Sequence, residues 1–358
     1  MLSRRESIKS LALCGIGCIT LRPAEASGCS NDQHFEEISI RAMGSELNVR
    51  WEISEVDAVD AKQVRDELAA LLEKWNAILS DYDDESEASS LTQERNIGRS
   101  QMVSIELAEA ITKSKKWFEI SKGAFDVTCG AVTALRRKRR VVSPDEWKSA
   151  IQTMGWDGIE WDAEKREIKV NRKGLKFDFG GIGKGLAVDK TYELMNKLGE
   201  GRFVVNFAGN LRAGNPPSHL AGWPVEIDLL ETVQSESPKA YRIRLANLSM
   251  ATSGDQFQKL PDWKSKSQQD RSSHILDPKD GAGVIGQQAV TIFAEEASDA
   301  DAAATAACVQ LRRKNLAWLD DLSGRQQGMF GLAQEIVGGE SKVIEFGGFS
   351  EKLKLTRS

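Results

Sequence analysis

Apolar and polar residues alternate along residues 38–53, on both sides of Met43-Gly44. Because successive side chains of a strand point to opposite faces, this alternation predicts two strands joined by a tight turn, where glycine supplies unusual backbone angles. A second hairpin is predicted over residues 159–170, around Asp162-Ala163-Glu164. Apolar runs bounded by turn residues predict further strands at residues 176–179, 203–207, 225–229, 241–245 and 289–293.

Other segments repeat apolar residues every three or four positions, which is the spacing of an amphipathic helix. This pattern, or an Ala-rich run, predicts helices over residues 60–79, 105–121, 144–154, about 185–198 and 297–309. Residues 259–272 are polar, contain Pro261 and predict a loop that could cover a site next to His274. Because strands and helices do not alternate strictly, we expect an α+β fold with a largely antiparallel sheet flanked by helices.

The composition is that of a globular protein, with 358 residues of which 41% are hydrophobic and 28% charged. A formal net charge of -5 argues against a nucleic-acid surface, which needs a concentrated excess of Lys and Arg. The one basic run, residues 136–140, is predicted to be a solvated loop or helix end. It leaves open the docking of an acidic partner or of an anionic membrane surface.

The N-terminus carries the features of an export signal. Arg4-Arg5 precede a mildly apolar stretch over residues 11–21, and Ala24-Glu25-Ala26 fits a signal-peptidase site. We therefore predict that residues 1–28 are a cleaved, twin-arginine-like signal, that residues 29–358 form one domain, and that the protein is periplasmic or in the cell envelope. Cys29 follows a sequence similar to a lipoprotein cleavage box, so a lipid anchor at this residue is the alternative.

Cysteine and histidine are too scarce for a soft metal site or a disulfide framework. After cleavage only Cys129, Cys308 and, depending on the cleavage position, Cys29 remain, and the three histidines are dispersed along the chain. Any bound metal is therefore expected to have oxygen ligands.

A glycine-rich turn over residues 178–185 is the strongest local signal for chemistry. It reads Asp178-Phe179-Gly180-Gly181-Ile182-Gly183-Lys184-Gly185, the end of a predicted strand followed by the start of a predicted helix. Such a turn can present backbone N–H groups and one Lys to an anion. The glycine spacing fits neither a Walker A loop nor the dinucleotide fingerprint. The alternative is an ordinary strand-to-helix connection with a surface Lys.

Asp301 and Thr305 are one helical turn apart, so their oxygens lie on the same face of the predicted helix. A carboxylate and a hydroxyl, supplemented by backbone carbonyls and phosphates, suit Mg²⁺. The alternative is helix capping, with Ser298 or Asp299 at the N-cap.

His274 is the one histidine placed among other candidate site residues, in the segment Ser273-His274-Ile275-Leu276-Asp277-Pro278. A histidine can act as a general base near neutral pH. A structural role is the alternative for a single histidine.

Taken in order, these segments resemble the ApbE family of FAD:protein FMN transferases over residues 38–309. The resemblance rests on eight segments: Met43-Gly44-Ser45, Ser80-Asp81-Tyr82 with Ser86-Glu87, Gly123 to Thr128, Asp178 to Asp189, Asn206 to Asn210, Ala251 to Gly254, His274 to Gly281 and Ala300 to Thr305. Thr92, Ala208 and Asn210 depart from the family pattern. The tail from Leu322 onward matches no segment of the family pattern clearly.

The resemblance implies a single domain built as two sub-lobes with a flavin site between them. It implies that FAD is bound by Met43, Tyr82, Ala124, Phe125, Asp126, Asp178, Lys184 and Ile275. It also implies that Mg²⁺ is bound by Asp301, Thr305 and a backbone oxygen of Gly181. We expect His274 to be the catalytic residue, as the base that accepts the proton of an incoming Thr or Ser hydroxyl.

The expected activity is Mg²⁺-dependent transfer of FMN from FAD to a Thr or Ser hydroxyl of another exported or membrane redox protein, with release of AMP. Two alternatives remain: a Mg²⁺-dependent FAD pyrophosphatase that yields FMN and AMP, and a non-catalytic exported FAD-binding protein.

Overall fold

The computed structural model of the protein describes residues 19–21, 35–53, 59–138, 142–230, 240–254, 259–261, 271–284, 287–325 and 328–354. Most of the predicted export signal and Cys29 lie outside these residues. The exception is a three-residue strand, Ile19–Leu21, which pairs antiparallel with residues 225–227. Within the described residues, no helix combines the length and apolar character needed to cross a membrane.

The strands, in chain order, are β1 Ile19–Leu21, β2 Phe35–Ala42, β3 Ser45–Glu52, β4 Ser100–Met102, β5 Ile159–Asp162, β6 Glu167–Val170, β7 Phe203–Phe207, β8 Asn210–Ala213, β9 Trp223–Asp228, β10 Ala240–Leu245, β11 Leu248–Gly254, β12 Lys259–Pro261, β13 Arg271–Ser273, β14 Gln288–Ala294, β15 Phe330–Val337 and β16 Glu340–Phe346. The α-helices are α1 Ala61–Leu79, α2 Glu87–Leu91, α3 Ile105–Ile120, α4 Gly130–Arg137, α5 Pro144–Gln152, α6 Gly183–Lys197, α7 Ala297–Arg312, α8 Ala317–Arg325 and α9 Phe349–Lys352.

An eight-stranded sheet forms the centre of the molecule, in the order β16-β15-β14-β11-β8-β7-β3-β2. Each neighbouring pair is antiparallel. Every residue of β14 is buried, as expected for an inner strand covered on both faces. The α+β fold with a largely antiparallel sheet is therefore confirmed.

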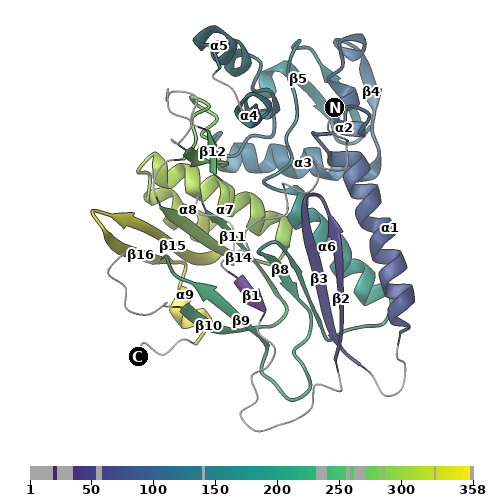
Figure 1. The fold of residues 1–358 in the computed structure, drawn as a ribbon, viewed down its shortest axis with the longest axis vertical. Helices are drawn as coiled ribbons and strands as arrows, with labels where there is room; N and C mark the ends of the chain where they lie inside the picture. The colour runs from purple at the N-terminus through teal and green to yellow at the C-terminus, as the bar shows by residue number, and fades with distance from the viewer. Residues whose placement is uncertain are drawn as a thin grey trace, which may run out of the picture.

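Helices cover one face of this sheet. α7 packs on β11 and β14, and α6 packs on β7 and β8 and against α7 (Figure 1). α1 lies outside α6 and buries Leu68, Leu72 and Trp75, in agreement with its predicted apolar spacing. On the other face, apolar residues of β9 and β10 and Phe349 of α9 join those of β8, β14 and β15 in one buried cluster.

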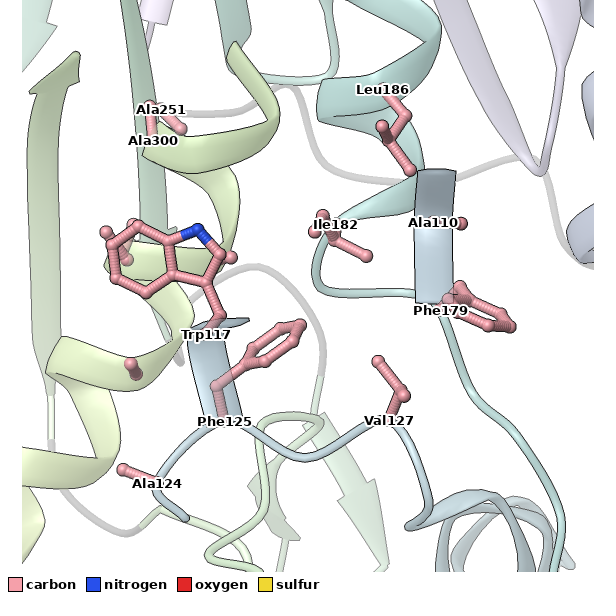
Figure 2. Packing of buried hydrophobic residues seen from close by; sticks show 14 of the residues in the cluster. Ala110, Trp117, Ala124, Phe125, Val127, Phe179, Ile182, Leu186, Ala251 and Ala300 are labelled. Carbon is pink, nitrogen blue, oxygen red and sulfur yellow. The ribbon is translucent and has the colours of Figure 1, made fainter. Parts of the chain in front are cut away.

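A second part of the chain lies beyond one end of the sheet and contains α3, α4, α5 and the small sheet β4-β6-β5 (Figure 1). One continuous apolar core joins it to α7 and the large sheet. Figure 2 shows Trp117, Phe125 and Ile182 filling the space between α7 and the start of α6, and Ala251 of β11 beside Ala300 of α7. This shared core connects the two parts within a single domain.

Most predicted elements are confirmed, and two predictions, a strand and a loop, are corrected. Residues 176–179 do not form a strand, because Lys176 makes only an isolated bridge to Cys129. The predicted loop over residues 259–272 begins and ends with the paired strands β12 and β13, while residues 262–270 lie outside the described structure. The tail after Leu322 is part of the fold, since β15 and β16 complete one side of the large sheet.

Candidate functional site

In the glycine turn before α6, the side chains of Asp178 and Lys184 both form hydrogen bonds with the backbone of Gly180. The N–H of Gly180 donates to Asp178 Oδ1 over 2.8 Å, and Lys184 Nζ donates to the Gly180 carbonyl oxygen over 3.1 Å. Both side chains are half-buried. Lys184 and the N-terminal end of α6, where the helix dipole is positive, therefore lie at one position, which favours an anion.

α6 and α7 approach so closely that only glycine fits between them. A Cβ on Gly185 would lie 2.5 Å from Ser298 Cα and 2.6 Å from the Ala297 carbonyl oxygen. The N–H of Gly185 donates to Asp301 Oδ2 over 3.1 Å. The two segments that sequence analysis singled out independently are thus in direct contact.

The start of α7 is capped by a residue from α6. Asp189 accepts hydrogen bonds from the backbone N–H groups of Ala297 and Ser298 over 2.8 and 2.9 Å, and it pairs with Arg212. Asp299 instead bonds to side chains of α3. The alternative in which Ser298 or Asp299 caps the helix is therefore wrong, because the long-range carboxylate of Asp189 satisfies these N–H groups.

Asp301 is only 5% exposed. Burial raises the pKa of its carboxyl group, and the nearby charge of Lys184 and the hydrogen bond from Gly185 act in the opposite direction. The charge of Lys184 offsets the burial of the Asp301 carboxylate only in part. Binding of a further cation next to this carboxylate is therefore electrostatically favoured.

Thr305 lies against the glycine turn. A Cβ on Gly181 would be 3.1 Å from Thr305 Oγ1 and 3.2 Å from the ring of Phe125. Ser253 of β11 adds a hydroxyl 3.4 Å from Thr305 Oγ1. Gly181, Thr305 and Phe125, which are far apart in the sequence, therefore share one site.

These donors fit Mg²⁺ rather than a softer metal. The described residues contain no group of three or more His, Cys, Asp or Glu side chains that could hold a metal. Asp301 would contribute a carboxylate, Thr305 a hydroxyl, and the adjacent turn a backbone carbonyl. Mg²⁺ prefers such oxygen donors in small number and leaves its other positions to water and phosphate.

The segment containing Ala124, Phe125 and Asp126 is attached to the glycine turn through its backbone. The N–H of Asp178 donates to the carbonyl oxygen of Val127 over 2.7 Å. Ala124 and Phe125 are buried in the core. Asp126 accepts from the N–H and hydroxyl of Thr128, and its burial raises the pKa of its carboxyl group to about 6.

Met43 reaches the site from the β2–β3 turn, where it adopts a positive φ of 46°. The terminal methyl of Met43 would be 3.4 Å from a Cβ on Gly183, at the first residue of α6. This apolar side chain therefore lies beside the N-terminal end of α6.

Tyr82 lies at the edge of the site, with 79% of its surface exposed. The guanidinium carbon of Arg137 lies 4.2 Å from the centroid of its ring. Arg137 also forms ion pairs with Asp81 and, over 3.5 Å, with Asp178. One arginine of α4 thus connects the Tyr82 loop with the glycine turn.

The backbone of Ser273 and His274 is held in place by the other arginine at the end of α4. Arg136 is 2% exposed and donates to the carbonyl oxygens of Ser273 and, over 3.3 Å, of His274. Ile275 is buried in the same core as Phe125.

Asp277, two residues beyond Ile275, anchors this segment to the end of α7. Burial would raise the pKa of its carboxyl group, but the hydrogen bond from Arg313 and the charges of Arg313 and Arg312 lower it below its ordinary value. The His274 segment is therefore fixed from two sides.

These contacts connect the glycine turn with Met43, Tyr82, Phe125, Asp301 and Thr305, and they hold the backbone of His274 to α4. Arg136 and Arg137, which are outside the predicted set, make several of these contacts. Sequence analysis predicted the basic run to be solvated. The position of residues 136 and 137 at a helix end is confirmed, but Arg136 is buried and Arg137 half-buried. No local pattern indicated this, because Asp81 and Ser273 lie far from them in the sequence.

Comparisons with known proteins agree with this geometry. The model of the ApbE family matches residues 43–330. The FAD:protein FMN transferase of Haemophilus influenzae is 24% identical over 288 residues, 78% of this chain and 82% of that protein.

Solved structures share the fold. The flavin transferase ApbE from Vibrio cholerae has a TM-score of 0.77 at 21% identity and covers 88% of this chain and 98% of its own. The apo flavinyl transferase ApbE from Pseudomonas stutzeri has a TM-score of 0.75 at 21% identity and covers 90% and 98%. The match of the family model over most of the sequence shows that this chain belongs to the ApbE family.

Proposed function

We propose that this protein is an FAD:protein FMN transferase, which moves FMN from FAD to a hydroxyl of another protein and releases AMP. The observation that carries the proposal is the direct contact between the glycine turn and α7, where Gly185 donates to Asp301. This contact unites an anion-binding helix end with a cation-binding carboxylate, as transfer from a pyrophosphate requires. Relatives named FAD:protein FMN transferase support the flavin as substrate.

Mg²⁺ is the proposed cofactor, with Asp301, Thr305 and a backbone oxygen of Gly181 as its ligands. When bound, it would neutralise negative charge on the pyrophosphate of FAD and on the departing AMP. Lys184 and the positive end of the α6 dipole would attract the phosphate oxygens.

FAD is proposed to lie between the large sheet with its helices and the part that contains α3, α4 and α5. Met43, Lys184 and Asp301 belong to the first part, while Tyr82 and the segment Ala124, Phe125 and Asp126 belong to the second (Figure 1). Asp178 and Ile275 connect the two. This arrangement supports the view of two sub-lobes that enclose the flavin.

His274 is the proposed general base. It would accept the proton of a Thr or Ser hydroxyl, whose oxygen forms a bond to the phosphorus of the FMN part of FAD. The bond from that phosphorus to the bridging oxygen breaks, and AMP leaves with the bridging oxygen. The backbone contacts of Arg136 with this segment support a fixed position for His274.

The acceptor is proposed to be an exported or membrane redox protein, because the N-terminal sequence has the features of an export signal. The protein itself is proposed to work in the periplasm or cell envelope, with lipid anchoring at Cys29 as the alternative to simple cleavage.

Two products distinguish this function from its alternatives. With FAD and Mg²⁺, release of AMP separates both enzymatic functions from a non-catalytic FAD carrier. Flavin fluorescence on the denatured acceptor band then separates a transferase from an FAD pyrophosphatase. AMP release without labelled acceptor, over a panel of exported redox proteins, would favour the pyrophosphatase.

A further inference from the structure

Arg137 contacts three side chains at the edge of the site. It pairs with Asp81 and with Asp178 and covers one face of the Tyr82 ring. Its side chain is 27% exposed, so these contacts are partly shielded from water. A planar guanidinium can bridge two carboxylates and stack on a ring at the same time, which a lysine cannot do.

The two carboxylates create an electrostatic difficulty for the proposed substrate. Burial and the charge of Asp178 both raise the pKa of Asp81, and Arg137 acts against them. Without a cation between them, two like charges would destabilise each other and would repel a pyrophosphate approaching Lys184. Arg137 supplies that cation.

Arg137 links the Tyr82 loop to the glycine turn. Ser86 and Ser89 donate to the carbonyl oxygen of Ser80, so these contacts hold the loop to itself. The contacts of Arg137 with Asp81 and Asp178 link it to the turn before α6. Losing Arg137 would therefore remove its contact with the Tyr82 ring and leave the charges of two carboxylates unbalanced.

We infer that Arg137 is a positioning residue for substrate binding, which fixes Tyr82 against the glycine turn and neutralises Asp81 and Asp178 so that an anionic flavin nucleotide can bind. The inference rests on the proposed function, because it assumes that the site binds FAD. It assigns Arg137 no role in bond formation or cleavage.

The first test measures FAD binding and transfer for Arg137→Gln and Arg137→Lys in the full protein. We expect the Kd for FAD to rise about tenfold or more in Arg137→Gln and less in Arg137→Lys, with kcat changed by less than about threefold. Arg202→Gln is the matched control, because Arg202 also pairs with a carboxylate, Glu52, but lies at the other end of β3 from Met43. It should bind FAD as wild type does.

The second test separates electrostatics from simple structural damage. In Arg137→Gln the uncompensated carboxylates repel the substrate, and salt screens that repulsion, so the difference in Kd from wild type should shrink as ionic strength rises. The double variant Asp81→Asn/Arg137→Gln should recover part of the lost affinity, giving a non-additive cycle. If Arg137→Gln does not fold, the double variant Asp81→Asn/Arg137→Gln is compared with Asp81→Asn instead. Asp178 is then the uncompensated carboxylate, so the difference in Kd between these two proteins should also shrink as ionic strength rises.

Each outcome decides the inference. A Kd within twofold of wild type for Arg137→Gln would overturn it while leaving the proposed function intact. A loss of kcat at unchanged Kd, or a salt-independent and additive loss, would overturn it as well. If wild-type protein does not bind FAD, both the inference and the proposed function fail.

Discussion

The two sides of the site are built in different ways. On the α6–α7 side, backbone N–H groups, glycines and short side chains determine the geometry, and Gly185 leaves no space for a Cβ. On the α4 side, long charged side chains determine it, with Arg137 reaching Asp81 and Asp178 and Tyr82 largely exposed. Close packing fixes the geometry of the first side. Ion pairs fix the geometry of the second side, and these are weakened by salt and by substitution of one partner.

This difference suggests that one side of the site serves the chemical step and the other side serves substrate binding. Groups that stabilise charge during transfer must be preorganised, and a closely packed pair of helices provides this. A substrate as large as FAD must also enter and leave, which an exposed edge permits. We therefore expect variants on the α6–α7 side to reduce turnover or folding, and variants on the α4 side to reduce binding.

Asp301→Ala should have the largest effect, because it removes the only carboxylate among the proposed Mg²⁺ ligands. We expect transfer to fall by about 1000-fold or more, measured as AMP release at saturating FAD and Mg²⁺. Asp299→Asn is the control from the same helix, since Asp299 bonds to Trp117 and Lys116 instead. Wild-type-like activity of Asp301→Ala would contradict the proposal that Asp301 is a Mg²⁺ ligand.

His274→Ala should reduce transfer by about 100-fold or more while FAD binding is retained, because loss of a general base affects the chemical step. Binding and single-turnover transfer are measured on the same sample. If FAD binding is lost instead, His274 belongs to the pocket and a different base must be sought.

Gly185→Ala should destabilise the protein by roughly 2–4 kcal/mol, because its Cβ would meet backbone atoms of α7 that cannot move away separately. Gly324→Ala is the matched control. Gly324 lies in α8 with no heavy atom within 4 Å of the added Cβ, so this variant should be neutral or slightly stabilised. Urea unfolding of both proteins measures the difference, and equal stabilities would contradict the close α6–α7 contact.

Asp126→Asn should change the pH dependence of stability. The folded pKa of Asp126, about 6, is above its ordinary value of 3.8. The stability that its protonated form contributes is therefore present below about pH 4 and lost as the pH rises through 6. Asparagine does not ionise, so the variant should gain up to about 3 kcal/mol relative to wild type between pH 4 and 7.5.

Denaturant unfolding at several pH values measures this gain. Asp162→Asn is the contrasting variant, because the hydrogen bond from Lys165 lowers the pKa of Asp162 and the difference from wild type should change in the opposite direction with pH. A pH-independent difference for Asp126→Asn would show that its carboxyl group is not buried as described.

Local patterns in the sequence were sufficient for the α6–α7 side. Asp301 and Thr305 share a helix face by spacing alone, and the glycine turn is recognisable from its composition. The capping of α7 by Asp189 could not be predicted in this way, because its partners are more than 100 residues away. Local capping patterns therefore gave the wrong residue.

The α4 side was predictable only in part. Tyr82 and Asp178 were identified through the family resemblance, whereas Arg137 was predicted to be solvated. A run of basic residues has the same composition whether it faces water or carboxylates. Only the tertiary arrangement, which places α4 beside the Tyr82 loop, decides between them. The failed strand at residues 176–179 has a related cause, because that segment contacts its neighbour through single backbone hydrogen bonds rather than through a ladder.

The most direct test of the account is mass spectrometry of an exported acceptor protein after incubation with this protein, FAD and Mg²⁺, with AMP measured in parallel. The account predicts one FMN on a Thr or Ser of the acceptor for each AMP released, and neither product with Asp301→Ala. AMP and free FMN without modified acceptor, or equal labelling by Asp301→Ala, would contradict it.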